Sequence, residues 1–91
     1  MAKLITPNGN IIEISPEGRE KLSPLELRHL LQTEKFDLIL LPNHLIMAIT
    51  VNHFPVINRL ATLLLREAGL RGSFDFVFGN AVILEDGELQ Q

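Results

Sequence analysis

The longest apolar run, FDLILLPNHLIMAITV over residues 36–51, restricts the possible folds of this chain more than any other feature. Pro42 and Asn43 suit the second and third positions of a tight turn, which divides the run into strands over residues 38–41 and 45–51. The run is interrupted and too short to span a bilayer. Because nearly continuous apolar strands are usually covered on both faces, we expect this pair at the centre of a sheet.

A β-hairpin is predicted at the N-terminus, in KLITPNGNIIEI. Asn8-Gly9 between apolar flanks favours a type I′ turn, in which both central residues have positive φ. Leu4 then falls in pattern with Ile12 and Ile14.

A short amphipathic helix is predicted over residues 24–32, in SPLELRHLLQ. Ser23 is a good N-cap, and Glu26 three positions later completes a capping box. Leu22 and Leu27 stand where a hydrophobic staple would close. These signals agree on where the helix begins.

The stretch VNHFPVINRLATLLLREAG, residues 51–69, predicts a longer helix, with Pro55 in its first turn and Gly69 as its C-terminal cap. At about 100° per residue, one broad apolar arc forms. The arc holds Phe54, Ile57, Leu60, Ala61, Leu64, Leu65 and Ala68. Val56 and Leu63 flank the opposite, polar side, so we expect this helix to be mostly buried or to be covered by a partner.

The C-terminal segment carries three alternating phenylalanines, which would share one strand face: Phe74, Phe76 and Phe78. Gly79-Asn80 can turn the chain so that residues 81–84 return as a second strand. A bulge within one longer strand is the alternative.

The predicted fold is therefore a single α+β domain over residues 1–91, with the element order β-β-α-β-β-α-β-β. We expect two layers: a mainly antiparallel sheet of about five to six strands, with one short and one long helix packed on it. The predicted core comprises Leu30, Ile39, Ile49, Ile57, Leu60, Leu64, Phe76 and Val82.

Composition narrows the functional classes. The chain has no cysteine, which excludes disulfides, thiolate metal sites and cysteine nucleophiles. The net charge of −3 argues against a general nucleic-acid binder. No signal peptide is visible, so a cytoplasmic protein without a membrane partner is expected. Hydrophobic residues make up 46% of the 91 residues, which is high for a small monomer and favours a homo-oligomer.

Catalytic and metal-binding patterns are weak. The three histidines, His29, His44 and His53, lack the one-turn spacing of a helical metal pair. Asp37 and Asp75, each beside a phenylalanine, are the carboxylates nearest to an apolar setting, but we expect ordinary solvent-facing or edge positions. No nucleophile elbow, Walker loop or dinucleotide fingerprint occurs, so neither a cofactor nor an enzyme activity is predicted.

One polar line crosses the second predicted helix. Asn58, Thr62 and Arg66 follow one another at four-residue spacing, and Arg59 lies beside them. Two guanidiniums with amide and hydroxyl donors suit a carboxylate or phosphate, and His53 near the helix N-terminus would add to such a site. Three interpretations stay open: a solvated face, a partner or subunit interface, and a site for a small anionic ligand.

The segments LPNHLIMAITVN, NRLAT and DFVFGNAVIL resemble a family of small domains of unknown function from bacteria, bacteriophages and other mobile elements. The positions that align are Asn58, Arg59, Ala61, Asp75, Gly79 and Asn80. An acidic residue usual in the family is replaced by His44. The resemblance carries no activity, but it implies a setting in which small proteins act on host machinery.

From these observations we expect a non-enzymatic binding protein that forms a homo-oligomer. In a phage, it would serve counter-defence by contacting a host protein or by sequestering an anionic, nucleotide-like signal. An enzyme acting on a phosphorylated small molecule is one alternative, with His53 as the available acid–base group. A nucleic-acid-binding module that stacks bases on the phenylalanines is the other.

Overall fold

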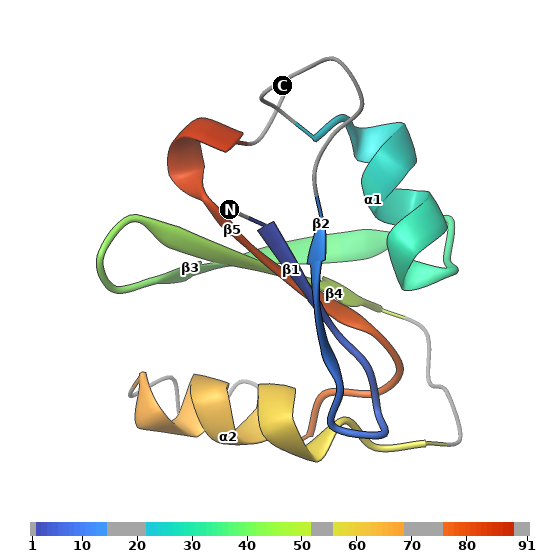
Figure 1. Cartoon of the computed structure of the whole chain (residues 1–91), viewed down its shortest axis with the longest axis vertical. Helices are drawn as coiled ribbons and strands as arrows, with labels where there is room; N and C mark the ends of the chain where they lie inside the picture. The colour runs from blue at the N-terminus through green and yellow to red at the C-terminus, as the bar shows by residue number, and fades with distance from the viewer. Residues whose placement is uncertain (1, 15–21, 52–55, 69–75, 89–91) are drawn as a thin grey trace.

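Five antiparallel strands form one sheet in the computed structural model, which describes residues 2–14, 22–51, 56–68 and 76–88 (Figure 1). The strands are β1 (Ala2–Ile5), β2 (Ile11–Ile14), β3 (Phe36–Leu41), β4 (Leu45–Thr50) and β5 (Ala81–Glu85). Their order across the sheet is β2-β1-β5-β4-β3, so the last strand along the chain is the central one. The predicted antiparallel α+β class is confirmed.

Two helices of similar length accompany the sheet: α1 (Pro24–Leu31) and α2 (Arg59–Glu67). A short 3₁₀ turn, η1 (Asp86–Glu88), follows β5. The prediction of one short and one long helix is wrong, because α2 starts only after Asn58. Within the described ranges, no helix has both the length and the apolar character needed to cross a membrane.

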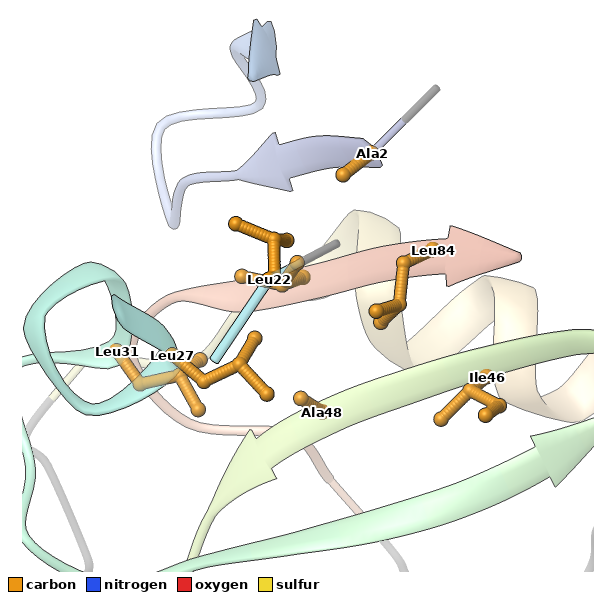
Figure 2. Close-up of a cluster of buried hydrophobic side chains, with 8 residues drawn as sticks. Ala2, Leu22, Leu27, Leu31, Ile46, Ala48 and Leu84 are labelled. Atoms are coloured by element: carbon orange, nitrogen blue, oxygen red, sulfur yellow. The ribbon is translucent and has the colours of Figure 1, made fainter. Parts of the chain in front are cut away.

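The helices lie on opposite faces of the sheet, as Figure 1 shows. Leu27 and Leu31 of α1 pack in one cluster with Ile46 and Ala48 of β4, whose side chains Figure 2 shows together. Met47 and Ile49 of β4 belong to a second cluster, together with Ala61 and Leu65 of α2. Successive strand residues point to opposite faces, so the two-layer prediction is wrong and the fold has three layers. A strand that is apolar on both faces needs a cover on each side.

β3 is an edge strand, which corrects its predicted central position. It pairs with β4 in the register that places Leu40 opposite Ile46, and it lies at the end of the strand order. Leu40 is 75% exposed and Leu38 is 42% exposed, whereas all of β4 from Ile46 to Thr50 is buried. The two halves of the apolar run therefore have different environments, although their sequences look alike.

The first hairpin has the predicted strands but a different turn. Leu4 pairs with Ile12 as expected. The Gly9 N–H donates to the Thr6 carbonyl at 3.0 Å, and Gly9 has a φ of 87° while Asn8 has no positive φ. A type I′ turn over Asn8-Gly9 is therefore wrong. Pro7 follows Thr6 and is suited to the second position of this turn, which leaves the left-handed conformation to Gly9.

α1 begins as predicted. The Ser23 hydroxyl accepts a hydrogen bond from the Glu26 N–H at 3.2 Å, and the Ser23 N–H donates to Glu26 Oε1 at 3.3 Å. Leu22 and Leu27 are both buried in the cluster beneath the helix. The helix ends at Gln32, whose left-handed φ of 56° turns the chain toward β3.

The predicted core is partly confirmed. Ile39, Ile49 and Val82 are buried. Leu30, Leu60 and Leu64 are only half-buried, while Ile57 and Phe76 are 37% and 47% exposed and do not belong to the core. The error at Ile57 and Phe76 has one cause: neither residue lies in the element predicted for it, since residues 56–58 precede the helix and residues 76–77 precede β5 without forming a strand.

Leu27 and Leu25 test how α1 contributes to stability, because the first is fully buried and the second is 63% exposed in the same helix. Leu27→Ala should lower the free energy of unfolding by about 2–5 kcal/mol. Leu25→Ala should change it by less than about 0.5 kcal/mol. Urea denaturation followed by circular dichroism measures both, and equal effects would contradict the placement of α1.

Candidate functional site

Asn58 is the N-cap of α2 and is completely buried. Its Oδ1 accepts a hydrogen bond from the Ala61 N–H at 3.1 Å. Asparagine is a favoured N-cap residue because its side chain satisfies one of the free N–H groups of the first turn. The helix therefore begins at Arg59. Pro55 and Gly69, the expected ends of the helix, lie outside the described residues, and Ala68 is the observed C-cap.

The amide group of Asn58 also links three parts of the chain. Its Nδ2 donates to the carbonyl of Ile5 in β1 at 2.9 Å and to the carbonyl of Gly79 at 2.8 Å. Its backbone N–H donates to the carbonyl of Val77 at 2.7 Å. The side chain thus fixes α2 to β1 and to the segment that leads into β5.

Thr62 has a structural role as well and is only 6% exposed. Its hydroxyl donates to the Asn58 carbonyl at 2.7 Å and accepts from the Val77 N–H at 2.9 Å. Both hydrogen-bonding functions of the hydroxyl are therefore used inside the protein. Asn58 and Thr62, predicted as half of a polar binding line, are thus both buried and hydrogen-bonded within the fold, and a binding role for them stays a prediction.

Of the predicted site residues that the structure describes, Arg59 and Arg66 are the exposed ones. They border a surface hollow of about 360 Å³ that is otherwise lined mainly by apolar side chains. Its lining consists of Ile57, Arg59, Thr62, Leu63, Arg66 and Phe76, and we call this set the α2 surface. The Arg66 guanidinium carbon lies 5.6 Å from the centre of the Phe76 ring, within the range of a cation–π contact.

Phe76 and Leu63 give the α2 surface its apolar character, with exposed fractions of 47% and 53%. Phe76 faces outward because the next residue, Val77, is buried at 2% exposure and hydrogen-bonded to Asn58 and Thr62. The sequence did not identify Phe76 as a surface residue. The alternation of apolar residues in SFDFVF fits either face, and only the hydrogen bonds of Val77 decide between them.

Two predicted features of the site are not described by the structure. His53 and Phe74 both lie outside the described residues. Phe78 is half-buried and forms an isolated bridge with Ile57, so the described part of the phenylalanine series contains no base-stacking strand face. Among the residues that the structure describes, no group of three His, Cys, Asp or Glu side chains converges in a way that suits a metal ion.

A wider hollow lies beside the C-terminal end of α1 and is lined by Arg28, Gln32 and Glu34 among other residues. Two of its polar side chains, Arg28 and Thr33, hold the chain after the helix. Arg28 Nε donates to the Glu34 carbonyl at 3.1 Å, and the Thr33 hydroxyl donates to the Lys35 carbonyl at 3.1 Å. The α2 surface is the better candidate because it combines exposed apolar side chains with guanidiniums.

Substitutions in the polar line should separate its structural half from its exposed half. Asn58→Ala removes a cap and leaves the buried carbonyl of Ile5 without its donor, which should cost about 2–4 kcal/mol. Thr62→Val should cost about 1–3 kcal/mol, since it leaves the Val77 N–H unsatisfied. Arg59→Ala is the control and should stay within about 0.5 kcal/mol of the wild type. Urea denaturation of the three variants gives these differences directly.

Asn58→Asp refines this test, because a carboxylate keeps the capping oxygen but replaces the amide donor. The new oxygen would face the carbonyls of Ile5 and Gly79. Chemical denaturation at neutral pH should show a loss at least as large as that of Asn58→Ala. A variant as stable as the wild type would mean that the capping oxygen alone holds α2 in place.

Comparison with protein-family models, with curated proteins and with solved structures gave no match. Membership of the family of small phage and mobile-element domains therefore stays a prediction. The function of the α2 surface has to be inferred from its own residues.

Proposed function

We propose that this chain is a non-enzymatic, cytoplasmic binding protein whose α2 surface binds a segment of another protein. The segment would carry an acidic residue next to a large apolar side chain. The observation that supports this proposal is the pair of exposed arginines, Arg59 and Arg66, at the border of an exposed apolar hollow.

The apolar part of the α2 surface favours a protein partner. Phe76, Leu63 and Ile57 are each more than one-third exposed. Aromatic residues and arginine are enriched in protein interfaces, where a few of them carry most of the binding energy. A hollow of about 360 Å³ is near the lower limit for small-molecule sites but has room for one large side chain of a partner.

The charge of the α2 surface favours an acidic segment. The chain as a whole is acidic, with a net charge of −3, so two arginines in one place mark a local exception. The guanidinium carbon of Arg66 lies 5.6 Å from the centre of the Phe76 ring, and guanidinium groups also suit carboxylates. An apolar surrounding would strengthen such an ionic contact.

The class of partner follows from the family resemblance. In a phage or mobile element, a small binding protein of this kind would contact a host protein, and counter-defence is the corresponding role. An enzyme is less well supported, because the described residues that line the hollow include no carboxylate and no imidazole. A nucleotide-like signal remains the second candidate, since Phe76 and the two arginines suit a base and a phosphate.

Selection from a random peptide library tests the proposal and does not require an identified partner. The wild type should enrich sequences that combine Asp or Glu with Phe, Leu, Trp or Met. Arg59→Ala with Arg66→Ala should weaken binding of the enriched peptides at least about tenfold, the effect of about 1.4 kcal/mol. Lys3→Ala with Lys35→Ala removes the same charge from two other exposed positions and should leave the affinity unchanged.

Thermal unfolding with a panel of nucleotides and inorganic phosphate separates the two candidate ligands. If the α2 surface binds a protein segment, the unfolding midpoint should not move with any member of the panel. A stabilisation that disappears in the double arginine variant would assign the surface to a small anion instead. Enrichment of peptides without acidic residues would contradict the proposed charge recognition.

A further inference from the structure

The outer edge of β3, with which no described strand pairs, is a second candidate for recognition, separate from the α2 surface. Among the described strands, β3 pairs only with β4 and ends the sheet on one side. It has six residues, whereas β2 at the other edge has four. In Figure 1 the β3–β4 hairpin reaches beyond both helices, at the left of the view.

The backbone groups on this edge can be assigned from one hydrogen bond. The Val51 N–H donates to the carbonyl of Lys35 at 3.4 Å, and these two residues continue the register of the β3–β4 pair. Because hydrogen-bonded and non-hydrogen-bonded pairs alternate in an antiparallel ladder, Asp37, Ile39 and Leu41 also direct their peptide groups toward β4. The outward N–H and C=O groups are therefore those of Phe36, Leu38 and Leu40.

Within β3, Asp37 is the only side chain that opposes pairing of this edge. Leu38 and Leu40 share the sheet face that α1 packs on, opposite to Ile39, and are 42% and 75% exposed. Natural edge strands are usually protected by lysine, proline, a bulge or an inward-pointing charge. β3 contains no lysine, no proline and no bulge, and its single charge, Asp37, is exposed.

We infer that β3 pairs with β3 of a second copy of this chain, antiparallel and across a two-fold axis, to form one continuous ten-stranded sheet. Ile39 lies opposite Ile39 of the second copy. Leu38 then lies opposite Leu40 of the second copy, and the outward backbone groups of each such pair exchange two hydrogen bonds. The two-fold axis makes the same contact twice, as in an isologous interface.

The charge of the edge favours this register over the one centred on Leu38. With Ile39 at the axis, Asp37 faces Leu41 of the second copy, and the carboxylates of the two copies stay apart. With Leu38 at the axis, the two Asp37 residues would become diagonal neighbours at about 7–8 Å. The register centred on Ile39 also pairs the two most exposed apolar side chains of the strand with each other.

Sedimentation equilibrium over a concentration series tests the dimer. The wild type should reach twice the 10.2 kDa mass of the chain. Leu40→Lys should shift the mass to that of the monomer, because a lysine on an edge strand opposes pairing. Leu25→Lys introduces the same change at a leucine that is 63% exposed in α1, and it should leave the dimer intact. Circular dichroism of each variant should confirm that it is folded.

Disulfide cross-linking tests the register, since the chain has no cysteine of its own. Leu38→Cys mixed with Leu40→Cys should form a cross-linked dimer under mild oxidation. Leu38→Cys alone should not, because its two copies would be diagonal neighbours too far apart for a disulfide. A cross-linked dimer of Leu38→Cys alone would overturn this arrangement. The absence of a cross-linked dimer from both samples would overturn it as well.

Different experimental results would contradict the dimer and the proposed function. Arg59→Ala with Arg66→Ala should abolish peptide binding and leave the mass at twice that of the chain. A wild type that is monomeric at every concentration overturns the inference and leaves the α2 surface unaffected. A dimer that survives Leu40→Lys but is lost in the double arginine variant also overturns it, and would place the interface on α2.

Discussion

The buried amide of Asn58 is the contact on which the position of α2 depends. A single side chain caps the helix, donates to β1 and donates to the segment before β5, so three regions distant in sequence meet at one residue. Inside a protein, a hydrogen-bond network stabilises the fold more when every polar group in it has a partner than when some groups are left without one. Thr62 completes the network by accepting the N–H of Val77. Their combined effect is to set both the start of α2 and the outward direction of Phe76.

This network also sets where the backbone of the two exposed arginines lies, because it fixes α2. Arg59 follows the cap directly, and Arg66 lies in the last turn of the helix, in contact with Phe76. The spacing of the two residues along the backbone is therefore set by the helix. Three of the positions that suggested a family resemblance take part in holding the fold: Asn58 as described, Gly79 through a φ of 69°, and Asn80 through a hydrogen bond to Leu30 at 2.9 Å.

The sequence predicted elements better than it predicted their environments. The start of α1 followed from Ser23 and Glu26, whose capping signals are local and act in any surrounding. The edge position of β3 did not follow, since Leu38 and Leu40 look like core residues until the strand order is known. For the same reason, Asn58 looked like a polar surface residue. Its partners are 53 and 21 residues away in sequence, a distance that no local pattern reports.

The alternation of β4 has a consequence for the register of the sheet. Ile46 and Ala48 pack in one cluster and Met47 and Ile49 pack in the other, so both faces of the strand are packed. A slip by one residue would exchange the two sets and push the bulky Met47 side chain into the space that Ala48 leaves for α1. In most half-buried strands only one face resists such a slip. Here steric fit on both sides excludes it, and the central pairing is defined without help from the turns.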